Sequence, residues 1–271
     1  MTDARRRILI VVENLPVPFD RRVWLEATTM ARHGHPVSVI CPKARGFIKG
    51  YELLEDVAIY RYPLPFEARG GLGFAAEFAW CFVATTLLSL WVALVGRGFD
   101  VLHACNPPDT FWLLARFWHL FGRRFIFDHH DLAPEMFAAK FGRDRGWLHR
   151  GLLWLERLSM RSADVVIATN ESHRRIAIQR GGKRPGDVFV VRSGPDFGRL
   201  RTYPVDPEWR AGKTHLLVYL GEICQQDGVD YLVRAVRLLL ERRQDFHVLF
   251  VGGGRISRSF APTRPSRAWR A

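Results

Sequence analysis

The sequence has few cysteines, with four in 271 residues and none in a CxxC pair. Histidines are not clustered with them at zinc-site spacing, so neither a disulfide framework nor a structural zinc site is expected. Scattered cysteines in a chain of this length indicate reduced thiols and a cytoplasmic protein. A signal peptide is not expected either, because the apolar run after Arg7 is short and meets Glu13.

Several signature loops are also missing. The sequence contains no GxxxxGK[ST] phosphate loop, no GxGxxG turn after the first predicted strand and no GxSxG nucleophile elbow. It therefore gives no support to the phosphate-loop, dinucleotide-binding and serine-hydrolase classes that these loops mark.

Acidic residues are in the minority, with 27 Asp and Glu against 40 Lys and Arg and a net charge of +13. That balance favours an anionic partner: a nucleic acid, an acidic membrane surface or a phosphorylated small molecule. The alternative is a basic surface that is only solvated. We expect no nucleic-acid partner, because the sequence lacks a recognised motif and a basic stripe interleaved with aromatic residues.

Long uncharged runs are scarce, with one exception at residues 78–95. This run, FAWCFVATTLLSLWVALV, has 18 residues and reaches the lower length limit of a membrane span. Thr85, Thr86 and Ser89 make it less apolar, and a strand pattern follows directly at Phe99. Two interpretations stay open: a buried or membrane-skimming helix, and a segment in contact with a bilayer.

Strand-like and helix-like patterns alternate through most of the chain. Strands are predicted at 7–12, 37–41, 57–62, 100–104, 124–128, 165–169 and 188–191, and helices at 20–32, 110–121, 147–161 and 172–179, besides the apolar run. This alternation predicts an α/β fold with a Rossmann-like, doubly wound parallel sheet. Ligands of such sheets bind beyond the carboxyl ends of the strands, so the loops after the strands are the candidate sites.

The pattern divides the chain into parts. Residues 1–192 are predicted as the first domain, and residues 193–213, rich in Pro, Gly and charge, as a linker. Residues 214–254 are predicted as the start of a second Rossmann-like domain, with strands at 216–220 and 247–251 around a helix at 229–242. Residues 255–271 are an irregular tail rich in Arg, Ser and Pro. Because two strands bury little, we expect a truncated or frame-shifted end.

Three loops of the first domain carry candidate chemistry. In ENLPVPFDRR at 13–22, Asp20, Arg21 and Arg22 lie at a predicted helix start, where they bind polar or phosphorylated groups or simply cap the helix and face solvent. In FDHHDLAPE at 127–135, two histidines and three carboxylates suit acid–base chemistry, or a structural histidine. The loop HACNPPD at 103–109 is a third site or a rigid turn.

A fourth candidate lies in the second domain. The stretch YLGEICQQDGVD at 219–230 is predicted as a strand, a turn and a helix start. Gly221 permits a ligand to approach the backbone, and the helix start can hold pyrophosphate. No metal site is predicted, because the His and Asp residues at 128–131 are adjacent rather than at the spacing of one helix face.

Taken in order, these loops resemble glycosyltransferase family 4. The strings FDRRVWLEA, HxxNPPD, xHDLxPE, SGPD and YLGxxxxQDGVDYL follow one another as in bacterial members that build surface polysaccharides, over about residues 7–254. The resemblance implies the two-domain glycosyltransferase B-fold and hexosyl transfer from a nucleotide-sugar to a lipid-linked or polysaccharide acceptor. It also implies retention of configuration, no bound metal and no cofactor, since the nucleotide-sugar is a co-substrate.

The resemblance also implies roles for individual residues. His130 matches the active-site histidine, which contacts the donor sugar. The acceptor-side residues are Asp20, Arg21, Arg22, Asn106, Asp131 and Glu135. The donor-binding residues are Gly221, Glu222, Asp227 and Gly228. With the basic charge and the apolar helix, a lipid-linked acceptor implies a cytoplasmic protein at the inner face of the membrane.

One family element is missing. No two Glu residues have the Glu-x7-Glu spacing that grips the donor sugar and ribose. We therefore expect little or no transferase activity from this polypeptide by itself. The alternatives are a non-catalytic acceptor-binding module derived from such an enzyme and, less favoured, an epimerase of similar fold.

Overall fold

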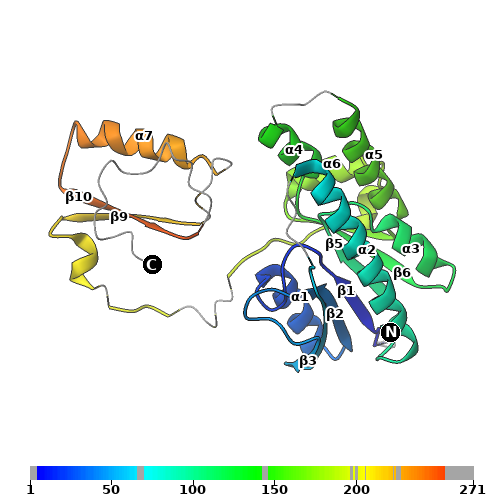
Figure 1. The fold of residues 1–271 in the computed structure, drawn as a ribbon. Helices are drawn as coiled ribbons and strands as arrows, with labels where there is room; N and C mark the ends of the chain where they lie inside the picture. Colours follow the sequence, from blue (N-terminus) through cyan, green and yellow to red (C-terminus); the bar gives the residue numbers. More distant parts are fainter. Residues whose placement is uncertain are drawn as a thin grey trace. The chain divides into compact units, whose positions relative to one another are not determined.

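The computed structural model describes residues 5–65, 70–141, 146–195, 198, 201–204, 206–221, 223 and 227–253. The chain divides into two compact units, unit 1 (Met1–Gly194) and unit 2 (Pro195–Ala271), whose elements are labelled in Figure 1. The predicted tail at 255–271 lies outside the described residues.

Unit 1 has the predicted alternation of strands and helices. Its strands are β1 (Ile8–Val11), β2 (Val37–Pro42), β3 (Tyr51–Leu54), β4 (Val57–Tyr62), β5 (Val101–Cys105), β6 (Arg124–His129), β7 (Val165–Ala168) and β8 (Val188–Val190). Its helices are α1 (Arg21–Arg32), α2 (Gly70–Leu94), α3 (Trp112–His119), α4 (Ala133–Phe141), α5 (Trp147–Ser162) and α6 (Glu171–Gln179), with a 3-10 turn η1 at Pro185–Asp187.

The strands form one sheet in the order β3-β4-β2-β1-β5-β6-β7-β8. All neighbouring pairs are parallel except β3 and β4, which are antiparallel. The direction of the strand order changes at β1, so β1, β5 and β6 lie next to one another at the centre. The Rossmann-like parallel sheet is thereby confirmed, with one antiparallel strand that was not predicted.

Two elements of unit 1 were missed in the sequence. β3 at Tyr51–Leu54 is largely exposed and lies at the sheet edge, so it lacks the apolar run of a buried strand. α4 at Ala133–Phe141 begins inside the stretch that was interpreted as a loop. Its Pro134 lies in the first helical turn, where a missing backbone N–H does no harm.

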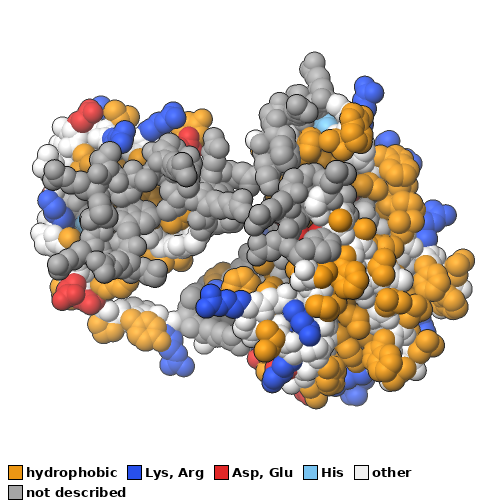
Figure 2. Space-filling model, in the orientation of Figure 1, with side chains coloured by type: hydrophobic (Ala, Val, Ile, Leu, Met, Phe, Trp, Pro, Cys, Tyr) orange, Lys and Arg blue, Asp and Glu red, His pale blue; other side chains and the backbone are white. Residues whose placement is uncertain are grey.

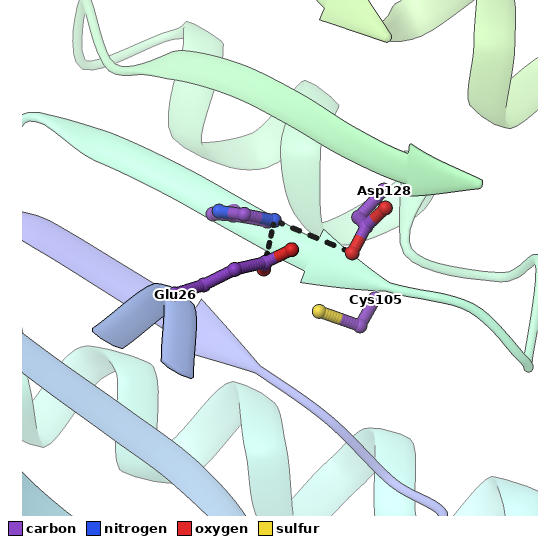
Figure 3. A group of neighbouring side chains, drawn as sticks. Glu26, Cys105 and Asp128 are labelled. Atoms are coloured by element: carbon purple, nitrogen blue, oxygen red, sulfur yellow. Dashed lines mark ion pairs between the residues drawn. The ribbon is translucent and has the colours of Figure 1, made fainter. Parts of the chain in front are cut away.

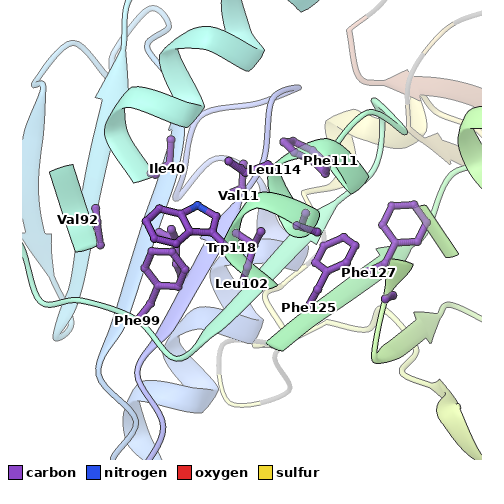
Figure 4. Close-up of a cluster of buried hydrophobic side chains, with 14 of the residues drawn as sticks. Val11, Ile40, Val92, Phe99, Leu102, Phe111, Leu114, Trp118, Phe125 and Phe127 are labelled. Carbon is purple, nitrogen blue, oxygen red and sulfur yellow. The ribbon is translucent and has the colours of Figure 1, made fainter. Parts of the chain in front are cut away.

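Side chains of β1 alternate between two hydrophobic cores. Ile8 and Ile10 face a core that includes α1 residues, whereas Leu9 and Val11 face a core that includes residues of α2, α3, α5 and α6. Figure 4 shows the second core, in which Trp118 packs edge-on against Phe99 with ring centroids 4.8 Å apart. The sheet is therefore covered on both faces, as a parallel sheet requires.

The apolar run at 78–95 forms most of α2, which packs on β2 and β4. Its segment Ala76–Leu94 is long and apolar enough to cross a membrane by length and composition, with a mean hydropathy of 1.6. Only 28% of this segment is buried within the protein. α2 is thus part of the fold and is also widely exposed.

Unit 2 contains β9 (His215–Leu220), α7 (Val229–Leu240) and β10 (Phe246–Val251), with a 3-10 turn η2 at Pro207–Arg210. β9 and β10 pair in parallel. A Cβ at Gly252 would lie 1.7 Å from the carbonyl oxygen of Gly221, so only glycine allows the two strand ends to meet. Among the described residues of unit 2, the buried apolar side chains are Val229 and Phe246.

Candidate active site

Polar side chains of unit 1 gather where the central strands end. β1, β5 and β6 are parallel neighbours, so their carboxyl ends lie at one edge, and Cys105 pairs in register with Asp128. α1 begins beside this edge, at Arg21. In Figure 3, Glu26 of α1, Cys105 of β5 and Asp128 of β6 point toward one another. The site therefore lies where the fold class predicts ligands to bind.

Arg22 forms the strongest pairing of this cluster. Its Nε and Nη2 donate to Asp128 Oδ2 and Oδ1 at 2.9 and 2.8 Å, and Nη2 is 3.1 Å from Glu26 Oε1. Nη1 donates to the Val191 carbonyl and to Ser193 Oγ. With 11% of its side chain exposed, Arg22 is held in place and is not the solvated arginine of the simpler interpretation.

His103 lies behind this pair, on β5. Its side chain is 3% exposed, and its Nε2 is 3.6 Å from Glu26 Oε2 and 3.9 Å from Asp128 Oδ2. Burial lowers the pKa of His103, but the nearby carboxylates of Asp128 and Glu26 outweigh it and raise the pKa above its usual value. The buried imidazole of His103 thus lies between two carboxylates that favour its protonated form.

His130 occupies the outer side of the cluster, directly after β6. Its Nδ1 is 3.6 Å from Asp128 Oδ2 and its Nε2 is 4.0 Å from Asp131 Oδ2, and 17% of the side chain is exposed. Burial works against the charged form, yet the nearby carboxylate of Asp128 raises the pKa of His130 above its ordinary value. Of the two histidines of the cluster, His130 is the one that solvent and a ligand can reach.

Asp128 and Glu26 respond differently to burial. Burial alone would raise the pKa of Asp128, but the nearby imidazoles of His103 and His130 and the hydrogen bonds from Arg22 hold it well below its usual range. For Glu26, desolvation is the largest effect and the pKa is raised. Asp128 is therefore the fixed negative charge, while Glu26 and the two histidines are groups that can exchange a proton.

Asn106 holds the loop that carries His130. Its side-chain Oδ1 accepts hydrogen bonds from the backbone N–H groups of His130 and Asp131 at 2.9 and 3.0 Å. Its Nδ2 donates to the Asp131 carbonyl at 2.7 Å and to Asp109 Oδ1 at 3.2 Å. Asn106 is fully buried and positions the loop, while its predicted role on the acceptor side stays a prediction.

A second polar network lies on the opposite face of the sheet. His129 is fully buried, and its Nε2 is 3.1 Å from Glu156 Oε1 of α5. Arg180 donates to Glu156 at 2.6 Å and to Glu135 Oε1 at 2.5 Å. Glu135, predicted on the acceptor side, is thus paired with the residue that follows α6. This network joins α4, α5 and α6 to the end of β6.

The remaining acceptor-side candidates are placed as follows. Asp20 caps α1, since its side chain accepts from the Val23 N–H at 3.1 Å. Arg21 is exposed at the first turn of α1. Asp131 keeps 38% of its side chain exposed beside His130, so it remains accessible to a ligand.

In unit 2, the predicted donor loop is described only in part. Gly221 lies at the end of β9, and Gly228, with φ of 68°, precedes α7 in the left-handed region. Asp227 is described and Glu222 lies outside the described residues. Asp230 stands in the first turn of α7, where its negative charge opposes anion binding.

One cavity of unit 2 lies elsewhere. It has a volume of about 370 Å³ and is lined at the amino ends of the strands by His215, Phe246, Arg210 and Arg243, among others. Gly221 lies at the opposite, carboxyl end of β9. We give more weight to the strand ends than to this cavity, because ligands of parallel sheets bind at carboxyl ends.

Glu26, His103, Cys105 and Asp128 also form a potential metal-ligand set, with ligand atoms within 4.8 Å of one another. Both oxygens of Asp128, however, already accept from Arg22, and Glu26 is paired with the same guanidinium. A cation would have to displace this positive group. The chemistry of the cluster therefore fits proton exchange better than metal binding.

Sequence reasoning singled out His130 and Arg22 but missed Glu26 and His103 as members of the same cluster. Glu26 carried a signal, because it follows Arg22 by four residues and shares its helix face. The sequence signal for His103 was weaker, because His103 was interpreted only as the first residue of a proline-stiffened loop. Glu156 and Arg180 were also missed.

Comparisons with known proteins agree with this fold. The family model of the glycosyl transferase 4-like domain matches residues 20–194. A search of curated proteins finds no match. Among solved structures, sucrose-phosphate synthase from Thermosynechococcus elongatus matches with a TM-score of 0.65 and 19% identity, over 92% of this chain and 63% of that one.

Two further structures share the fold. The catalytic domain of starch synthase IV from Arabidopsis thaliana, bound to ADP and acarbose, has a TM-score of 0.62 and 12% identity, over 93% of this chain and 69% of that one. An E. coli structure titled trehalose-6-phosphate, bound with UDP-2-fluoro glucose, has a TM-score of 0.62 and 10% identity, over 94% and 66%. The chain belongs to the glycosyl transferase 4-like family and has the glycosyltransferase B-fold.

Proposed function

We propose that this chain takes part in hexosyl transfer from a nucleotide-sugar to a lipid-linked or polysaccharide acceptor, with retention of configuration and without a bound metal. The observation that carries this function is the accessible His130, backed by Asp128 and Arg22 at the carboxyl edge of the sheet. Family membership supports glycosyl transfer, and two structures of the same fold are titled with ADP or with UDP-2-fluoro glucose bound.

In such a transfer, the bond between the anomeric carbon and the donor diphosphate breaks, and its electron pair leaves with the diphosphate. A bond to an acceptor hydroxyl oxygen forms on the same face of the sugar, and the hydroxyl proton is released. His130, with its raised pKa, supplies a hydrogen-bond donor and partial positive charge next to the sugar. Arg22 acts through Asp128, which fixes the imidazole.

The donor diphosphate is assigned to unit 2, at Gly221 and the start of α7. Free N–H groups at a helix start and a turn without a side chain suit a diphosphate. Asp230 in the first turn of α7 weakens this contact. A weak donor site is therefore expected for unit 2 by itself.

We assign acceptor binding to unit 1. A net charge of +13 attracts a phosphorylated acceptor, and the exposed apolar α2 suits one that is linked to lipid. We propose a cytoplasmic protein that binds peripherally at the inner face of the membrane.

The second candidate is a non-catalytic module that binds the acceptor. It is favoured by the contrast between the complete polar cluster of unit 1 and the acidic helix start of unit 2, with Asp227 and Asp230. A module of this kind would bind a phosphorylated acceptor through unit 1 and would turn over no donor.

Turnover of a panel of UDP-, GDP- and ADP-sugars with a lipid-phosphate acceptor separates the two candidates. We expect release of one nucleoside diphosphate, reduced at least about hundredfold in His130→Asn. His33→Asn, a change in a histidine at the end of α1, is the matched control and should keep full activity. Acceptor binding without turnover would favour the binding module, and the absence of both would contradict the proposed function.

A further inference from the structure

Three helices of unit 1 expose large apolar side chains to solvent. They are Phe78, Trp80, Val83, Leu87, Trp91 and Leu94 of α2, Leu113 and Phe117 of α3 with Leu120 and Phe121 after it, and Trp147, Leu148 and Trp154 of α5. In Figure 2, hydrophobic side chains cover the part of unit 1 that these helices form. We call this surface the α2–α3–α5 face.

The helices are joined, so the face is continuous. Trp118 of α3 donates from Nε1 to Ser89 Oγ of α2 at 3.2 Å. Trp112 of α3 and Trp154 of α5 pack edge to face, with ring centroids 6.1 Å apart. A continuous apolar surface of this kind marks an interaction site, whereas single exposed apolar residues do not.

The burial of α2 differs from that of an ordinary surface helix, although Phe82, Leu88 and Leu90 also pack against the core. Its buried side chains are small or polar: Cys81, Ala84, Thr85, Ser89 and Val92. Its exposed side chains include Val83, Leu87, Trp91 and Leu94, which recur at helical spacing. Because burial of a large apolar side chain is worth about 1.5–3 kcal/mol, this arrangement favours an apolar medium outside the protein.

The helices α3 and α5 also carry a one-sided charge. Their exposed charged side chains are Arg116, Arg150, Arg157 and Arg161. The single acidic residue of the two helices, Glu156, is buried and paired with His129 and Arg180. The face therefore combines apolar side chains with positive charge and no exposed carboxylate on these two helices, which complements an anionic lipid surface.

A pocket of about 310 Å³ lies on this charged side. It is lined by Arg150, Leu153, Trp154, Arg157 and Arg180. Arg180 is neutralised by its two glutamates, whereas neither Arg150 nor Arg157 forms an ion pair with a described residue. Two guanidinium groups that have no ion pair among the described residues, beside an exposed tryptophan, suit the phosphate of a lipid headgroup and the adjoining interface.

We propose that the α2–α3–α5 face docks on an anionic lipid bilayer and that Arg150 and Arg157 bind a headgroup phosphate. α2 would lie on the bilayer surface and not span it, because Thr85 and Ser89 are packed inside the fold. The positive charge of α3 and α5, with no exposed carboxylate on either helix, favours an anionic lipid surface as the partner. This docking rests on the proposed membrane-linked acceptor but requires no turnover.

Vesicle co-sedimentation of the full chain tests the docking surface. We expect binding to vesicles of phosphatidylcholine with phosphatidylglycerol, weaker binding to phosphatidylcholine alone, and a decrease with salt. Arg150→Ala with Arg157→Ala should weaken binding to the anionic vesicles about thirtyfold, since each arginine near such a surface contributes about 1 kcal/mol. Arg32→Ala with Arg45→Ala removes the same charge from other surfaces and should bind like the wild type.

A second pair of variants tests the apolar side chains of the α2–α3–α5 face. Leu87→Ser with Trp91→Ser should weaken binding to both kinds of vesicle at least about tenfold. Ile48→Ser with Leu53→Ser, which alters exposed residues outside the face, is the control. Because all these side chains are exposed, circular dichroism should show that every variant stays folded.

Three outcomes would overturn the inference. They are a wild-type chain that stays in the supernatant with anionic vesicles at low salt, face variants that bind like the controls, and a dimer dissolved by Leu87→Ser with Trp91→Ser while vesicles are not bound. Vesicle binding by a chain without transferase activity would leave docking intact and count against the proposed reaction. Turnover of a soluble acceptor without vesicle binding would support the proposed reaction and contradict docking.

Discussion

Unit 1 and unit 2 use the same local elements, yet they bury them to different extents. All four residues of β1 are buried, whereas no residue of β9 is fully buried. β1 has a neighbouring strand on each side and helices over both faces. Among the described residues, β9 pairs with β10 alone. The runs ILIV and HLLVYL are similar as sequences, so neighbouring strands decide which becomes a core strand.

The two units differ in the same way in their charges. Unit 1 buries Glu13, Asp128 and Glu156, and two of these are paired with histidine or arginine. In unit 2, the pair Arg243–Asp245 is exposed. Because buried charges interact far more strongly than exposed ones, unit 1 should account for most of the pH dependence of stability.

The largest expected effect contrasts the two cores. Phe125→Ala removes a fully buried ring and should lower the free energy of unfolding of unit 1 by about 4 kcal/mol. Phe250→Ala, in the partly exposed β10, should lower that of unit 2 by about 1 kcal/mol. Hydrogen exchange of each unit in denaturant measures both, and equal losses would show that β10 is as well packed as β6.

The next effect concerns the buried ion pair. Asp128→Asn leaves Arg22 without its main counter-charge and should destabilise unit 1 by about 3 kcal/mol. Asp100→Asn, which breaks the more exposed pair with Arg7, is the control and should cost about 1 kcal/mol or less. Denaturant unfolding measures both variants.

Asp128→Asn should also change how the histidines titrate. The pKa values of His103 and His130 are raised by Asp128 and should fall in the variant. In the wild type, this pairing stabilises the fold fully below the unfolded pKa near 6.5, and the stabilisation is lost as pH rises through the higher folded values. NMR titration of the imidazole resonances checks this, and unchanged values would contradict the assignment of Asp128 as their partner.

A smaller effect involves Glu13, a buried carboxyl after β1. Burial raises its pKa to about 8, and the nearby Thr85 only partly opposes this. The unfolded chain releases the proton near pH 4.5 while the folded chain keeps it, so stability falls as pH rises toward 8, by at most about 1.4 kcal/mol per pH unit.

Glu13→Gln removes this titration. The variant should be more stable than the wild type above pH 7, by on the order of 2 kcal/mol, and its stability should depend less on pH between 5 and 8. Denaturation midpoints across that range test it, with the exposed Glu171→Gln as the control. A pH dependence equal to that of the wild type would show that Glu13 is already ionised in the fold.

The smallest expected effect lies in unit 2. Arg243→Ala removes the exposed pair with Asp245 and should leave the melting temperature of unit 2 unchanged within error. A clear decrease would indicate that surface charges in the less buried unit matter more than the comparison suggests.

Much of the fold could be predicted because it depends on local patterns. β-branched runs marked the strands of unit 1, and Asp20 marked the start of α1. β3 was not predicted because its sequence, YELL, is exposed at a sheet edge and shows no buried face. α4 was not predicted because the polar residues at 127–135 were interpreted as a loop, although Ala133 and Glu135 are good helix formers.

The site was less predictable because its partners are distant in sequence. Arg22 and Asp128 are 106 residues apart, and only the arrangement of strands brings them together. The sequence therefore located His130 but could not separate an ion-paired Arg22 from a solvated one. Asn106 shows the same limit, since its support of His130 and Asp131 requires β5 and β6 to be neighbours.

The adjacent residues Asp128 and His129 serve opposite faces of one strand. Asp128 meets Arg22 of α1, and His129 meets Glu156 of α5. Inserting or deleting one residue within β6 would exchange the two side chains and leave both networks mismatched. Length changes should therefore be tolerated only beyond Asp131, so that natural variants or engineered chimeras of this domain would alter specificity through loops while inheriting β6 as an indivisible segment.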